Sequence, residues 1–112
     1  MTHAVDIHPA LETELAWLSR CHPREHAAIQ NARFKLEARG TQLGFPHSST
    51  IRSANAPLRE LRPRQGRSPW RVLYATRPRL VMLALAPEAQ HDLRRFAAAV
   101  RAAEARLAEQ RP

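Results

Sequence analysis

The stretch of sequence that decides the fold covers residues 58–86 and reads LRELRPRQGRSPWRVLYATRPRLVMLALA. Residues 58–62 alternate apolar and polar side chains, residues 70–76 are rich in strand-forming residues, and residues 80–86 are apolar on both faces. The links between these three segments are short, and consecutive strands with short links pair as an antiparallel meander. The sequence therefore predicts an antiparallel sheet with residues 80–86 near its centre.

Two helices and a short strand are predicted before this stretch. Leucines recur at helical spacing within residues 9–20, and Pro9 suits the first turn of a helix, where its missing N–H is not needed. A second helix is expected between Pro23 and Gly40, with the glycine ending it. Helices joined by so few residues form an antiparallel hairpin. The strand is expected at residues 3–8.

Two segments complete the prediction. Residues 41–57 are rich in glycine, proline and serine, which predicts a long irregular connection, or an ordered turn with a short strand near residues 50–51. Pro87 ends the last strand, and a C-terminal helix begins between residues 88 and 93. Apolar residues repeat there at spacings of three and four and form a seam for packing on the sheet. The seam consists of Leu93, Phe96, Val100, Ala103 and Leu107.

The order of these elements is typical of the α+β class. We expect an N-terminal strand and a helical hairpin packed on an antiparallel sheet of about four strands, followed by a C-terminal helix. The chain has 112 residues, which is the size of one domain.

Positive charge is concentrated in the second half of the chain. The net charge is +8, and 17 of the 18 basic residues are arginines, with Lys35 as the single lysine. Residues 57–80 contain seven arginines and one acid, Glu60. Such a one-sided positive field favours a polyanionic partner, which could be nucleic acid, an acidic protein or a membrane surface.

Missing motifs argue against hydrolases with a serine nucleophile elbow and against the usual kinds of nucleotide-binding enzyme. The sequence has no G-x-S-x-G nucleophile elbow, no G-x-G-x-x-G and no phosphate loop. Cys21, His22 and His26 lie close together, but a structural zinc site needs four regularly spaced ligands, so we expect no metal and no cofactor. The lone cysteine, the absence of a readable signal peptide and the short apolar runs predict a cytoplasmic protein that does not bind membranes.

Arg71 lies inside an apolar strand candidate, and a buried arginine is costly unless it is paired. It therefore needs a charged partner or a bound anion. Spacing alone favours an ion pair with Glu60 on the neighbouring strand. Because side chains alternate along a strand, Arg59 and Arg62 are expected to point to opposite faces of the sheet.

The run from residue 58 to 62, the basic glycine turn, residues 70–74 and the apolar strand together resemble RelE/HigB-like toxins. The resemblance is closest to the phage-derived HigB-type branch of the RelE/ParE superfamily, whose pattern is L-x-E-L-R … R-x-x-Y followed by an apolar strand. It implies a single toxin domain over residues 1–112, belonging to a type II toxin–antitoxin system. Such a toxin enters the ribosomal A site, cuts mRNA and inhibits translation, and a co-encoded helix-turn-helix antitoxin neutralises it.

The resemblance also implies roles for individual residues. RNA cleavage of this kind uses the 2′-hydroxyl as nucleophile, so the protein must orient it, stabilise the phosphate and move protons. Arg71 and Arg62 match family arginines that stabilise the scissile phosphate, because a guanidinium donates two parallel hydrogen bonds to phosphate oxygens. Glu60 and His91, to which no family motif assigns a role, are the candidates for proton transfer. Arg59, Arg64, Arg67, Arg94 and Arg95 are the candidates for RNA binding.

Two departures from the family pattern keep other functions open. The branch carries two lysines just after the last strand, whereas residues 86–90 contain none, and no tyrosine occurs near the C-terminus. The alternatives are a non-catalytic toxin-like protein, either gyrase-directed as in ParE or degenerate, and a plain basic domain that binds nucleic acid. If the chain is a toxin, Arg71→Ala is expected to keep the fold and relieve growth arrest.

Overall fold

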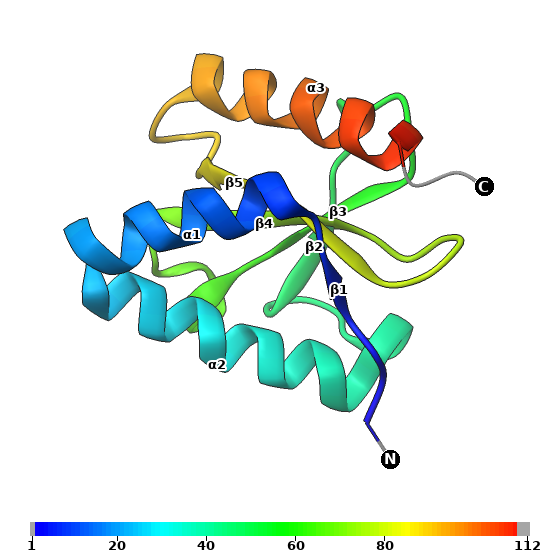
Figure 1. Cartoon of the computed structure of the whole chain (residues 1–112), viewed down its shortest axis with the longest axis horizontal. Coiled ribbons are helices and arrows are strands. Elements are labelled where there is room, and N and C mark those ends of the chain that lie inside the picture. The colour runs from blue at the N-terminus through cyan, green and yellow to red at the C-terminus, as the bar shows by residue number, and fades with distance from the viewer. Residues whose placement is uncertain (1, 110–112) are drawn as a thin grey trace.

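The computed structural model describes residues 2–109 and has the α+β architecture that the sequence predicts (Figure 1). In chain order, the elements are β1 (Asp6–Ile7), α1 (Pro9–Cys21), α2 (Pro23–Arg39), the short 3-10 turn η1 (Gly40–Gln42), β2 (Ser48–Thr50), β3 (Leu58–Leu61), the short 3-10 turn η2 (Pro63–Gly66), β4 (Trp70–Ala75), β5 (Val81–Pro87) and α3 (Leu93–Glu109). Within residues 2–109, five strands form one sheet in the order β1-β5-β4-β3-β2.

The centre of the sheet is the antiparallel meander of β3, β4 and β5 that residues 58–86 predict. Two edge strands extend it. β2 pairs antiparallel with β3, so residues 41–57 include the short strand that was the alternative for this segment. β1 runs parallel to β5, so the sheet is mixed rather than wholly antiparallel. No direction was predicted for β1. The chain between β1 and β5 is long and includes α1 and α2, and such a connection allows parallel pairing.

The sheet separates two layers of helices. α1 and α2 cover one face, and α3 covers the other (Figure 1). The side chains of β4 alternate between these layers: Val72 and Tyr74 pack with α1 and α2, whereas Leu73 and Ala75 pack with α3. By the same alternation Arg71 lies on the face that α3 covers.

The apolar seam of α3 is confirmed over most of its length. Phe96, Val100 and Ala103 are buried, and Leu107 packs partly against the same cluster. Leu93 was expected in the seam, but it is 68% exposed. It is the first residue of α3, one turn before the residues that contact the sheet, so its place in the spacing pattern does not bring it into the core.

Proline and glycine set the ends of the elements as predicted. Pro9 and Pro23 are the first residues of α1 and α2, and Pro87 is the last residue of β5. Gly40 follows α2 with a φ of 57°, and a Cβ atom at this position would lie 2.8 Å from the His3 ring. Both the backbone angle and the close approach therefore favour glycine at the end of α2.

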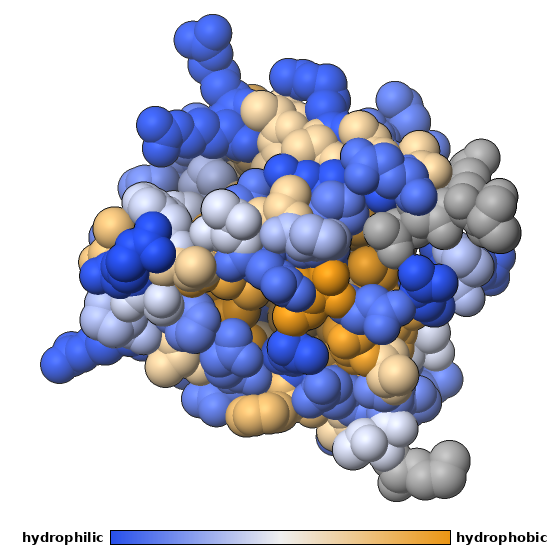
Figure 2. Space-filling model, in the orientation of Figure 1, coloured by the Kyte–Doolittle hydropathy of each residue, from blue (hydrophilic) through white to orange (hydrophobic). Residues whose placement is uncertain are grey.

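The face of the molecule seen in Figure 2 is mostly hydrophilic, with some apolar residues visible near its centre. Exposed large apolar side chains include Phe45, which is 75% exposed in the loop between η1 and β2. No helix within residues 2–109 is long and apolar enough to cross a membrane.

Candidate active site

Side chains from two strands and one loop meet at the edge of the sheet where β3 ends and β4 begins. The register pairs Glu60 with Leu73, which places Glu60 diagonally opposite Arg71 on the same face. Pro87 is paired with Trp70, so the chain after β5 also arrives beside Arg71. We call the resulting cavity of about 340 Å³ the carboxylate cavity. It is lined by Glu60, Arg62, Gly66, Arg71, Glu88, Ala89 and Gln90.

Arg71 is the most deeply buried charged residue of this cavity, at 3% exposure. Its Nε donates to Glu60 Oε1 over 2.9 Å, and its Nη2 donates to Glu88 Oε2 over 3.0 Å. The predicted ion pair with Glu60 is thus confirmed, and Glu88 adds a second one. Further N–H groups donate to the carbonyl oxygens of Gly66, Ser68 and Trp70. Since a guanidinium has five N–H groups, every donor of Arg71 is used.

Arg62 lies nearer the solvent and is less constrained. Its Nε donates to the Pro46 carbonyl over 3.1 Å, and its Nη1 forms an ion pair with Glu60 Oε1 at 3.7 Å. The guanidinium carbon is 5.0 Å from the centre of the Phe45 ring, a cation–π contact. Gly66 has a φ of 94°, and a Cβ there would collide with the Arg62 guanidinium. The glycine turn therefore leaves room for Arg62 at the mouth of the cavity.

Two carboxylates flank the guanidinium of Arg71 at different depths. The Glu60 side chain is 15% exposed and interacts with both arginines, while the Glu88 side chain is 31% exposed and interacts with Arg71. A carboxylate held in this way can accept a proton from a bound ligand, and a guanidinium beside it can donate hydrogen bonds to a phosphate. The cavity thus combines a proton acceptor with donors for an anion.

The structure brings together three of the four residues proposed for catalysis, namely Glu60, Arg62 and Arg71. His91 is exposed in the turn that follows Glu88 and does not line the carboxylate cavity. No role was predicted for Glu88 from the sequence. The antiparallel pairing of β4 with β5 was the signal that could have found it, because it returns the end of β5 to the start of β4, next to Arg71.

The five arginines proposed for RNA binding are dispersed. Arg59 donates to Ser48 Oγ and Thr50 Oγ1. Because Ser48 also bonds to the buried Tyr74 hydroxyl, Arg59 lies on the face opposite the carboxylate cavity, as the alternation predicts. The other four are exposed. They are Arg64, which pairs with Glu25 at 3.0 Å, Arg67 in the turn before β4, and Arg94 and Arg95 in the first turn of α3.

The segment around Cys21 has a packing role. His22 makes ring contacts with Trp17 and Trp70, with centroids 5.8 and 6.0 Å away, and Cys21 is exposed. Within residues 2–109, no group of three or more His, Cys, Asp or Glu side chains could hold a metal ion.

Comparison with known protein families gives a match over much of the chain. The model of a family described as "Phage derived protein Gp49-like (DUF891)" matches residues 16–87, well over half of the chain. The match includes α2, all of β2 to β5, and Glu60, Arg62 and Arg71 of the carboxylate cavity. Comparisons with curated proteins and with solved structures found no match.

Proposed function

This chain belongs to the phage-derived Gp49-like protein family, a family of RelE/HigB-like toxins, and we propose that it is the toxin of a type II toxin–antitoxin pair that cuts mRNA on the ribosome. Membership in a toxin-like family implies a cognate antitoxin as partner. The observation that supports an enzymatic role is the carboxylate cavity, where two carboxylates and two guanidinium groups surround a space of about 340 Å³. We extend the toxin domain to the whole chain.

The proposed reaction is attack of an RNA 2′-hydroxyl on the adjacent phosphate. Glu60 accepts the proton of the 2′-hydroxyl, and the 2′-oxygen bonds to phosphorus. The bond from phosphorus to the 5′-oxygen then breaks, and the leaving oxygen takes a proton from water at the open mouth of the cavity. The hydroxide that remains takes the proton from Glu60, which restores the carboxylate. Glu60 suits the role of base because two arginines hold its carboxylate in place, at 2.9 and 3.7 Å.

The two arginines have different roles in this proposal. All five N–H groups of Arg71 already bond to protein oxygens, so Arg71 positions Glu60 and Glu88. Arg62 lies at the mouth, and its Nη2 donates no hydrogen bond within residues 2–109, so it is the donor that can reach a phosphate. Arg62 stabilises the negative charge that develops on the phosphate oxygens, and the geometry of the base depends on Arg71.

The direct test is controlled expression followed by primer extension on a translated reporter mRNA. Wild type is expected to produce discrete cuts and growth arrest, and Glu60→Gln to lower the cleavage rate by about 10²–10⁴-fold. Glu12→Gln is the matched control, because Glu12 is exposed in the first turn of α1 and does not line the carboxylate cavity. Equal cleavage by wild type and Glu60→Gln would contradict the assignment of the base.

Ribosome dependence needs a separate experiment with the purified protein. Cuts are expected in mRNA on translating ribosomes and not in the same mRNA alone. Growth arrest with intact message and a DNA-damage response would instead support the gyrase-directed alternative. Strong binding to naked nucleic acid without toxicity would support a plain binding domain.

A further inference from the structure

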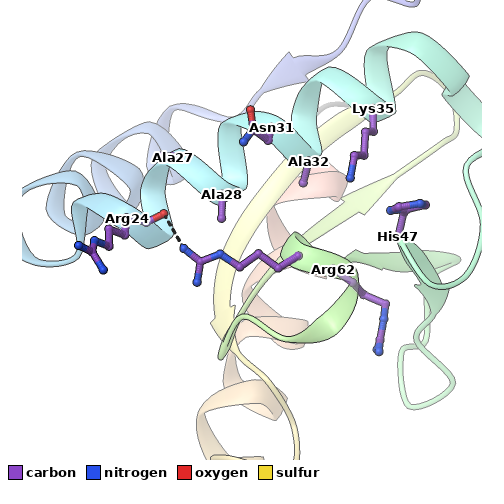
Figure 3. Close-up of a pocket in the computed structure, with 9 residues that line it drawn as sticks. Arg24, Ala27, Ala28, Asn31, Ala32, Lys35, His47 and Arg62 are labelled. Carbon is purple, nitrogen blue, oxygen red and sulfur yellow. Dashed lines mark hydrogen bonds between the residues drawn. The ribbon is translucent and has the colours of Figure 1, made fainter.

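A second cavity, of about 320 Å³, lies between α2 and the segments that flank β2 and β3 (Figure 3). We call it the basic cavity. Figure 3 shows Arg24 and Lys35 near the two ends of the α2 wall and His47 facing this wall from the opposite side. The lining residues are Arg24, Ala27, Ala28, Asn31, Ala32, Lys35, His47, Arg62 and Arg64.

The basic cavity has an excess of positive charge. Four of its lining residues are cations, and none is a carboxylate. Arg64 pairs with Glu25, and Arg62 pairs with Glu60. Lys35 forms no ion pair within residues 2–109, and neither does the side chain of Arg24. Two cations beside a concave surface without a counter-charge favour an anionic ligand.

Small side chains create the space. Three alanines of α2 form part of the wall, so no long side chain fills the hollow between the cations. Asn31 adds an amide that can both donate and accept hydrogen bonds. The volume lies at the lower end of the range of roughly 300–1,000 Å³ that is usual for small-ligand sites. A single anionic group with an attached sugar suits this size better than a folded protein segment does.

The basic cavity adjoins the carboxylate cavity. Arg62 lines both, and in Figure 3 its side chain points away from Lys35. The 75% exposed ring of Phe45 lies against the Arg62 guanidinium, 5.0 Å from its carbon to the ring centre. An exposed aromatic ring beside a guanidinium that lines both cavities is a platform on which an unpaired base can stack.

We propose, building on the function proposed above, that the basic cavity binds a phosphodiester group of single-stranded RNA next to the group that is cleaved. The Lys35 ammonium holds this phosphate, the Arg24 guanidinium holds a neighbouring phosphate of the same strand at the other end of the α2 wall, and Phe45 stacks on a base between the two cavities. The RNA therefore takes most of its affinity from the basic cavity, while the carboxylate cavity, whose charges are already matched, contributes the chemistry.

Fluorescence anisotropy with a labelled 2′-O-methyl oligouridylate tests this proposal, since the probe cannot be cleaved. Lys35→Ala and Arg24→Ala are each expected to raise the Kd by roughly three- to tenfold. Each is also expected to reduce the slope of log Kd against log salt concentration by about 0.7, the value for one lost contact on a single strand. Lys35→Arg is expected to restore binding.

Arg101→Ala is the matched control, because it removes one exposed positive charge from α3, on the other side of the sheet. It is expected to leave the Kd within twofold of wild type. Lys35 and Arg24 are exposed, so their variants should fold, and circular dichroism checks this. Wild-type affinity in both variants, or equal weakening by Arg101→Ala, would overturn the proposal.

Three further outcomes separate this proposal from the function itself. In the ribosomal cleavage assay, Lys35→Ala is expected to raise the KM and leave kcat unchanged, and a loss of kcat at saturating message would overturn the assignment as a separate subsite. If Lys35→Ala and Arg24→Ala keep the RNA affinity of wild type but bind the purified antitoxin more weakly, the basic cavity is a protein-binding surface instead. If the wild type cuts no mRNA, the function proposed above fails, whereas the RNA subsite still depends on the anisotropy result.

Discussion

The two cavities that meet at Arg62 differ in how their charges are balanced. In the carboxylate cavity, Arg71 is 3% exposed and each of its donors has an acceptor, including Glu60 and Glu88. In the basic cavity, Lys35 and Arg24 are exposed and form no ion pair within residues 2–109. Matched, buried charges hold each other in one geometry, whereas unmatched, exposed charges remain available to a ligand.

Because of this difference, we expect substitutions in the two cavities to affect different properties of the protein, namely its stability and its affinity for an anion. Changes in the carboxylate cavity are expected to alter both folding and chemistry, because its side chains are the acceptors and donors of one another. Changes in the basic cavity are expected to alter affinity for an anion with little effect on folding. The following predictions test this separation, from the largest expected effect to the smallest.

Arg71→Ala is expected to lower the free energy of unfolding by about 3–5 kcal/mol, because it leaves Glu60 and several buried carbonyl groups without their partner. Urea denaturation followed by circular dichroism measures the loss. This replaces the sequence-based expectation that the variant keeps its fold, so the variant is a poor test of catalysis. A loss below about 1 kcal/mol would show that the buried network does not stabilise the fold.

Gly66→Ala is expected to destabilise the protein by about 1–2 kcal/mol, because the left-handed φ of 94° is costly for a residue with a Cβ. The new methyl group also meets the Arg62 guanidinium and displaces it from the mouth of the carboxylate cavity. Cleavage should therefore fall further than the loss of folded protein explains. Thermal unfolding and cleavage rates on the same samples compare the two effects, and a fall in cleavage no larger than the folded fraction predicts would contradict a role for Arg62.

Glu88→Gln is expected to cost about 1 kcal/mol, less than Arg71→Ala, because the amide oxygen still accepts a hydrogen bond from Arg71 and the side chain is 31% exposed. Chemical denaturation measures the cost. Destabilisation as large as that of Arg71→Ala would mean that Glu88, rather than Glu60, is the main partner of Arg71. Glutamine has nearly the same shape as glutamate, so this variant is expected to keep the fold and the shape of the carboxylate cavity.

Lys35→Ala is expected to change the free energy of unfolding by less than about 0.5 kcal/mol, because the ammonium is exposed and has no ion pair within residues 2–109. The same denaturation experiment measures it beside Arg101→Ala. A stability loss above about 1 kcal/mol would show that Lys35 stabilises the fold. The two cavities would then not differ in their contribution to stability.

Several features of the site follow from the sequence, and others do not. The pairing of Arg71 with Glu60 follows from two neighbouring strands whose side chains alternate, and the structure has it at 2.9 Å. Glu88 was missed because its place depends on where β5 ends relative to β4. Arg24, Lys35 and His47 were missed as a group because they lie outside the arginine-rich residues 57–80 and meet only when α2 packs on the sheet.

By itself, the sequence determined the α+β class, the central meander and the face of the sheet on which Arg71 lies, because the alternation of strands and the signals of proline and glycine are local. Only the tertiary structure decided the parallel edge strand β1, the exposure of Leu93 and the division of the positive charge between two cavities. Whether a charged side chain has a partner depends on contacts between distant segments, such as Arg64 with Glu25. Those contacts are set by how helices pack on a sheet, which no local pattern specifies.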